Sequence, residues 1–410
     1  MSAPENCINH RTLFEIIWSC VATVFACTWT AVHINVPPLC HSAESTWQQI
    51  KKRVIVMAST IIAPEFMIIW AIKERVVAAR ILVDRPKWTL SHGFFLLMDG
   101  FVLYDKKGNF IGPLTPPILS ERVESGEIDF PMAVTQSEIE DKSKGDFFTK
   151  LVVLCQTSWF IVQCIAHAFT GLSLTHLEMA TFAFALLNVV VYAMWWHKPQ
   201  NVGIPIRVFL KESLDTSPLP ALGRLRTENM HPPFYLLEEA QALYGRAAAP
   251  FLNFFIHFVS CPLVMNGQGC QLSSLLISPC ALGPSEVLMI FLSLSVISML
   301  FGSFHLFSWL DSFPSIIESY LWCSSAVLCT LLPVTSIPLG VHYYSVWITQ
   351  PPCPELEDRY KLVLRIMLIL LPIYFIARSM LIVIASSSLR NLPADAFVTF
   401  SWSVFWPHFE

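Results

Sequence analysis

Two apolar runs joined by a short polar turn decide the fold, and together they occupy residues 150–196: KLVVLCQTSWFIVQCIAHAFTGLSLTHLEMATFAFALLNVVVYAMWW. A membrane-spanning helix needs about 20 mostly apolar residues, each rising about 1.5 Å, to cross about 30 Å of hydrocarbon. Lys150–Phe169 and Leu177–Trp196 both meet this requirement. The stretch therefore predicts two consecutive transmembrane helices.

The composition of the whole chain agrees with this prediction. Of the 410 residues, 54% are hydrophobic and 14% are charged, against about 25% charged residues in a typical soluble domain. A soluble globule cannot hide so much apolar surface, so we expect the excess to face membrane lipids. The net charge is only -4, which excludes nucleic acid as a partner on electrostatic grounds. The oligomeric state is left open.

The same length criterion predicts further spans along the chain. They are Leu13–Ile34, Val54–Ile72, Val287–Leu310, Ile316–Leu332 and Tyr360–Ala385, with a shorter run at residues 250–265 that either spans or re-enters the membrane. Two polar loops, 73–148 and 197–249, separate these runs. Within the first loop, Leu90–Tyr104 is expected to be interfacial or packed on the bundle, and Thr135 or Ser137 to cap a short acidic helix. We predict an all-α transmembrane bundle of seven or eight spans, forming one integral membrane domain over residues 1–410.

The distribution of basic residues predicts the orientation. Cytoplasmic loops carry an excess of Lys and Arg. If eight spans cross and the N-terminus is cytosolic, most of the 26 basic residues fall in the cytosol, and so do both polar loops. We therefore expect a multi-pass protein of the endomembrane system or plasma membrane with both termini in the cytosol.

Ionisable residues inside apolar runs mark the candidate site. Such groups cost a few kcal/mol in hydrocarbon and usually face the interior of a bundle. The candidate intramembrane polar pocket consists of Glu65, His257, His305, Glu318 and Arg378. One hypothesis is that the pocket binds or protonates a lipophilic substrate, and the alternative is a structural ion pair of Arg378 with Glu318 or Glu65. Near the ends of spans, Glu178 and Arg365 are expected to snorkel to the interface.

Prolines and cysteines leave further alternatives. The run Leu331–Val341 (LLPVTSIPLGV), with Pro333 and Pro338, predicts either a broken transporter helix or a simple kink. Cys40, Cys270, Cys280 and Cys353 fall in loops placed outside the cytosol, where they would form two lumenal disulfides with three possible pairings. No CxxC motif and no helical histidine pair occurs, so no metal site and no cofactor is predicted. Catalytic residues are not assigned.

Several stretches together resemble a large, functionally uncharacterised family of multipass membrane proteins of filamentous fungi. They are WSCVATVFACTWTAVHINVP at residues 18–37, IIAPEFMIIWAIKERVVAARI at 61–81, WTLSHGFFLLMDGFVL at 88–103 and the block from Glu138 to Val202, with a tail that ends in Trp, Pro and His. The resemblance covers most of the first 200 residues. It implies a fungal host and a link with secondary metabolism, and it transfers no catalytic residue.

Three functions remain in view at this point. The first is an enzyme or accessory protein acting on a terpenoid or lipid, the second is a carrier that uses the segment Pro333–Pro338, and the third is a non-catalytic scaffold or receptor. In the third hypothesis the loops, especially Glu138–Asp146, recruit soluble partners. A closed pocket with convergent polar groups favours the enzyme, and a bundle whose interior charges are all paired favours the scaffold.

Overall fold

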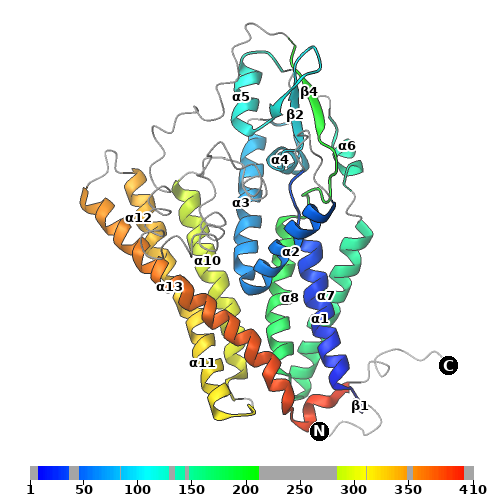
Figure 1. Ribbon diagram of the computed structural model, residues 1–410, viewed down its shortest axis with the longest axis vertical. Helices are drawn as coiled ribbons and strands as arrows, with labels where there is room; N and C mark the ends of the chain where they lie inside the picture. Colours follow the sequence, from blue (N-terminus) through cyan, green and yellow to red (C-terminus); the bar gives the residue numbers. More distant parts are fainter. Residues whose placement is uncertain are drawn as a thin grey trace, which may run out of the picture.

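A computed structural model describes residues 8–36, 46–83, 85–128, 134–143, 147–211, 284–310, 312–348 and 354–400. These residues form a bundle of apolar helices with a small α/β cap at one end (Figure 1). The strands next to the two termini, β1 (Ile8–His10) and β5 (Val398–Phe400), pair antiparallel at the other end (Figure 1). The predicted all-α bundle is thus accompanied by short strands that the apolar pattern did not indicate.

Six helices in the described residues are long and apolar enough to cross a membrane. They are α1 (Leu13–Ala31), α7 (Phe147–Thr170), α8 (His176–Met194), α10 (Pro284–Leu306), α11 (Ile316–Leu331) with its continuation α12 (Ser336–Ile348), and α13 (Pro354–Ser387). Short 3-10 turns cover Phe307–Leu310, Leu332–Thr335, Ser388–Arg390 and Ala394–Phe397. Many outward side chains of the six long helices, such as Phe14, Phe25 and Val383, are exposed and apolar, as contact with lipid requires. The predicted seven or eight spans are not confirmed, and residues 250–265 lie outside the described residues.

The predicted span Val54–Ile72 is broken in the middle. It divides into α2 (Thr46–Ile62) and α3 (Pro64–Val83), which are bent by 113° at the break. Proline has no amide hydrogen and disfavours helical geometry in the residue before it, so α2 ends at Ile62, before Ala63, and a new helix starts at Pro64. Arg53 at the start of this pair contacts the end of α1 through the Trp29 carbonyl, and α3 runs into the cap (Figure 1). The pair therefore enters and leaves the bundle at the cap end as a re-entrant hairpin.

This hairpin places the cap and the termini at opposite ends of the bundle (Figure 1). A single crossing by α1 separates β1 from the cap, because α2 and α3 together return to the side where they began. The predicted arrangement, in which the termini and the loop 73–148 share one side of the membrane, is not confirmed.

The cap is built from α4 (Leu90–Leu97), β2 (Phe101–Tyr104), β3 (Phe110–Pro113), α5 (Pro116–Glu124), α6 (Gln136–Asp141) and β4 (Ile206–Phe209). Its three-stranded sheet has the order β3-β2-β4, with β2 antiparallel to β3 and parallel to β4. The segment Leu90–Tyr104 packs on the bundle, which was one of its two predicted placements. Phe94 and Leu97 join the core of the bundle, and the neighbouring Phe95 and Leu96 join the core of the cap. A Cβ on Gly93 would lie 2.8 Å from the Ala78 carbonyl, so glycine lets α4 approach α3 closely. Thr135 caps α6 as predicted, accepting from the Glu138 amide.

Candidate functional site

The tip of the re-entrant hairpin carries a buried polar cluster, which we call the hairpin-tip site: Glu65, Tyr374 and Arg378. Glu65 and Arg378 are 1% and 3% exposed. The Tyr374 hydroxyl donates to Glu65 Oε1, and the Arg378 Nε donates to the Ile62 carbonyl at 2.9 Å. Arg378 Nη2 lies 4.0 Å from Glu65 Oε2. Two of the predicted pocket residues, Glu65 and Arg378, therefore come together.

The break in the hairpin explains why these charges are held inside the bundle. The C-terminus of a helix carries a partial negative charge and unpaired carbonyls, while the N-terminus carries a partial positive charge. Arg378 binds the last carbonyl of α2, and Glu65 lies in the first turn of α3. Each charge thus complements the nearby helix end, and the two charges complement each other.

Aromatic rings connect this cluster to His305. The Arg378 guanidinium lies 3.9 Å from the centre of the Phe301 ring, a cation–π contact. The His305 ring lies 4.8 Å from the same Phe301 ring, and His305 Nδ1 is 2.9 Å from the Phe301 carbonyl oxygen. The Trp322 indole donates to the His305 carbonyl at 3.0 Å. His305 is therefore next to the site, fixed by backbone contacts rather than by the carboxylate.

The other predicted pocket residues do not join the hairpin-tip site. Glu318 lies in the first turn of α11 and pairs with Arg390 and with the Ser387 hydroxyl. Of the two ion pairs left open by the sequence, the structure contains the one between Arg378 and Glu65. His257 lies outside the described residues.

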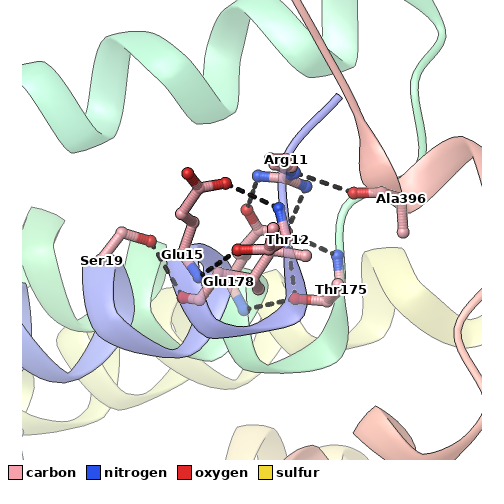
Figure 2. Close-up of polar contacts among 8 residues, drawn as sticks. Arg11, Thr12, Glu15, Ser19, Thr175, Glu178 and Ala396 are labelled. Atoms are coloured by element: carbon pink, nitrogen blue, oxygen red, sulfur yellow. Dashed lines mark hydrogen bonds and ion pairs between the residues drawn. The ribbon is translucent and has the colours of Figure 1, made fainter. Parts of the chain in front are cut away.

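A second charge cluster closes the end of the bundle where the chain termini meet (Figure 2). Both Nη atoms of Arg11 donate to the Glu178 carboxylate, and Arg11 Nε donates to the Ala396 carbonyl at 2.8 Å. The Thr175 amide and hydroxyl each donate to Glu178 Oε2 at 3.0 Å. Glu178 is only 3% exposed, so the prediction that it snorkels to the interface was wrong. Here it joins α1, α8 and the C-terminal segment.

A third cluster lies where the cap meets the bundle, and the sequence reasoning missed it. Lys198 Nζ is fully buried and donates to Glu74 Oε2 at 2.6 Å. The same ammonium lies 5.0 Å from the centre of the Trp70 ring and 4.3 Å from that of Trp195. Burial lowers the pKa of Lys198, while the Glu74 carboxylate opposes this shift. Burial likewise lowers the pKa of His33, whose ring is 5.2 Å from Trp195, well below its ordinary value.

The cap contains a cleft of about 510 Å³, which we call the β4 cleft. It is open to solvent on one side and lies between α6 and the edge strand β4. Apolar and charged side chains share its lining: Ile128, Val134, Glu138, Asp141, Lys142, Ile206, Arg207, Val208, Phe209 and Lys211. Three of these residues belong to the segment Glu138–Asp146 that the scaffold hypothesis singled out.

A family model described as "Family of unknown function (DUF8562)" matches residues 2–86, 80–217 and 284–409. The chain belongs to this family. The matched residues include both arms of the hairpin, the β4 strand and the helices that hold the hairpin-tip site. Comparisons of the DUF8562 chain with curated proteins and with solved structures give no match.

Two further predictions concern the remaining DUF8562 sequence. Pro333 and Pro338 lie within one span, Ile316–His342. Pro333 lies in the short 3-10 turn Leu332–Thr335 and Pro338 in the first turn of α12, so the segment 331–341 is a local irregularity within that span and not a broken helix. Cys40, Cys270, Cys280 and Cys353 lie outside the described residues, and their pairing stays a prediction. In the described part of the chain, no group of three or more His, Cys, Asp or Glu side chains is placed to hold a metal ion.

Local sequence signals existed for some of the missed contacts. Thr12-x-x-Glu15 and Thr175-x-x-Glu178 both have the spacing of a capping box, which places the glutamate at a helix start. No local signal exists for the pair of Lys198 and Glu74, because these two residues are 124 positions apart in the sequence.

Proposed function

We propose that this protein is a multipass membrane scaffold whose cap recruits a soluble partner in the cytosol through the β4 cleft. Three observations support the proposal. The cleft is preformed and carries charges of both signs, it lies outside the bundle, and the buried carboxylates of Glu65 and Glu178 each lie beside an arginine. Of these, the position of the cleft on the cap carries the proposal, because a substrate pocket for a lipid would open towards the membrane.

The proposal requires the cap to face the cytosol and the termini to lie on the opposite side. The distribution of basic residues supports this orientation under the positive-inside rule. Lysines and arginines of the described chain gather at the cap end, in α2, α3, the cap segments and the first turn of α7, whereas the end with the termini has Arg11 and Arg390. This orientation keeps the loop 73–148 in the cytosol, as predicted, and moves the termini to the opposite side.

An N-glycosylation reporter tests the orientation. One variant carries an Asn-x-Thr reporter tail after Glu410, and the other carries the same reporter inserted after Gly108, in the exposed turn between β2 and β3. We expect glycosidase-sensitive modification of the tail reporter and none of the cap reporter. Modification of the cap reporter alone would reverse the orientation and remove the proposal of cytosolic recruitment.

Site-specific photo-cross-linking in the native host cell tests recruitment itself. A photoreactive amino acid is placed at Asp141, in the β4 cleft, or at Lys106, which is exposed in the cap but does not line the cleft. We expect a discrete adduct with a soluble protein at Asp141 and none at Lys106, and its loss when Lys142→Glu is added. Adducts of equal yield at both positions, or at neither, would contradict recruitment through the cleft.

A lipophilic substrate at the hairpin-tip site is the second candidate function, and one observation favours it. Glu65 Oε2 is buried, has no hydrogen-bond partner in the described residues and lies 4.0 Å from Arg378. A polar head group of a terpenoid or lipid could bridge these two side chains. Metabolite profiles of a deletion strain carrying Glu65→Gln test this function, with Glu318→Gln as the matched control away from the site. If both variants restore every lost product at equal protein levels, the hairpin-tip site does not act on a substrate.

A further inference from the structure

The strand β4 forms an unpaired edge of the cap sheet. Its hydrogen bonds to β2 are made by alternate residues, with the Ile206 amide donating to Gly100 and the Leu210 amide donating to Tyr104, at 2.7 and 3.1 Å. In a parallel ladder the intervening residues direct their amides and carbonyls away from the neighbouring strand. Arg207 and Phe209 therefore present main-chain groups at the open edge, and these have no backbone partner among the described residues.

After Phe209, the next residue whose amide points away from β2 is Lys211, and this amide already has a partner within the chain. The Lys211 amide donates to the Glu127 carbonyl at 2.8 Å, in the position that a carbonyl of an added strand would take. This contact shows that the edge can be extended, and within the described part of the chain it leaves the four residues of β4 without a strand on their outer side. An unprotected edge strand is a template for pairing with another chain.

The outward-facing side chains of the sheet add a specific surface to this edge. The rings of Phe110, Tyr104 and Phe209 form a row across β3, β2 and β4, with centroid distances of 5.9 and 5.7 Å. Phe110 and Phe209 are 43% and 55% exposed. Arg207 completes the row, with its guanidinium 5.4 Å from the centre of the Tyr104 ring. Aromatic residues and arginine are the side chains that most often dominate binding energy at protein interfaces.

We propose that the partner recruited by the cap binds as an extended segment that adds a strand to β4, with an acidic residue opposite Arg207. This inference rests on the proposed function and names its partner class. Cross-strand neighbours lie on the same face of a sheet, so the residue opposite Arg207 meets its guanidinium. The residue two positions away then lies opposite Phe209, where an apolar side chain fits. Main-chain hydrogen bonds supply affinity and these two side chains supply specificity, as in other strand additions.

Fluorescence anisotropy with the purified full-length protein in detergent tests the inference. The probe is a labelled nine-residue peptide of alternating Thr and Val with Glu at its centre, and the comparison peptide has Lys in place of Glu. We expect the Glu peptide to bind about tenfold more tightly than the Lys peptide, because opposite charges attract and like charges repel across strands. The variant Arg207→Glu should reverse this preference, while Lys106→Glu, a charge reversal in the neighbouring turn, should leave it unchanged.

A backbone-modified peptide separates strand addition from simple charge attraction. Methylation of the amides that would donate to β4 keeps every side-chain charge, and we expect it to weaken binding at least about tenfold. Thermal unfolding of each variant in the same detergent confirms that the cap remains folded. Equal binding of the Glu and Lys peptides, or no effect of methylation, would overturn strand addition. Should the cross-link at Asp141 persist in that case, recruitment stands and only its mode is refuted.

Discussion

The Arg11–Glu178 cluster allows a quantitative prediction of stability. Replacing Arg11 with Met removes the cation and keeps an apolar stem of similar length. The Glu178 side chain is 4% exposed and that of Arg11 14%, so the variant leaves a carboxylate buried without its charged partner. Breaking a buried pair in this way typically costs about 3–5 kcal/mol. Two donors from Thr175 and the N-terminus of α8 remain to stabilise the carboxylate, which reduces the expected loss to about 2–3 kcal/mol.

A substitution of the other partner, Glu178, is expected to lower the free energy of unfolding by less. Glu178→Gln keeps an acceptor for Thr175 and removes the buried negative charge, and the arginine left behind retains its bond to the Ala396 carbonyl. We expect a loss of about 1–2 kcal/mol, the cost of weakening charged hydrogen bonds. The double variant should be less damaging than the sum of the two single losses, because residues in one network are coupled.

Unfolding in mixed micelles with increasing fractions of a denaturing detergent measures these free energies. The matched control is Arg390→Met at the same end of the bundle, where the arginine side chain is 68% exposed beside Glu318. Such an exposed pair contributes at most about 1 kcal/mol. If Arg11→Met cost no more than Arg390→Met, or less than Glu178→Gln, the assignment of this cluster as a buried clasp between the termini would be refuted.

Three further variants test the packing and titration of the cap. Gly93→Ala should lower the free energy of unfolding by about 1–3 kcal/mol in the same titration, because its Cβ meets the Ala78 backbone, whereas Gly112→Ala, with open space around it, should not. Lys198→Met should destabilise the protein, and adding Glu74→Gln should restore part of the loss, because it neutralises the carboxylate that lost its partner. Burial raises the pKa of Asp99 to about 7, so the folded state holds a proton that the unfolded chain releases from about pH 4 upwards, and stability should fall as pH rises through this window. In Asp99→Asn, thermal unfolding measured between pH 4 and 8 should lose this slope, and an unchanged slope would contradict the assignment.

The features that depend on residues close together in the sequence, namely the limits of the apolar helices and the cap of α6, were predicted well. The apolar runs at α1, α7, α8, α10 and α13 lie close to their predicted limits, since length and hydropathy are local properties. The cap on α6 followed from the side chain of Thr135 in the same way. Pro64 lies within the second predicted span, but a hydropathy criterion counts apolar residues and carries no information about the direction of the chain. Hydropathy could therefore not predict the 113° bend between α2 and α3.

The candidate site was predicted only as a set of residue types. Each ionisable side chain in an apolar run needs a partner, but the identity of that partner depends on how distant helices pack. Arg378 lies 316 residues from the Ile62 carbonyl that it binds, and its choice of Glu65 over Glu318 follows from the position of the hairpin tip. The β4 cleft had no sequence signal beyond its charges, because β4 and α6 meet only through the fold of the cap.

The hairpin also determines which membrane orientation follows from the distribution of basic residues. Counting residues 54–72 as a full span adds one crossing before the basic loop 73–148, so this loop was assigned to the side of the termini. With the hairpin returning to its starting side, the same basic residues favour the proposed orientation, with the cap in the cytosol and the termini opposite. The two arginines at the end with the termini fit this orientation. Arg11 and Arg390 are each paired with a glutamate. The cap end, in contrast, holds unmatched basic side chains such as Lys142 and Arg207 beside the β4 cleft, where an acidic partner would be attracted.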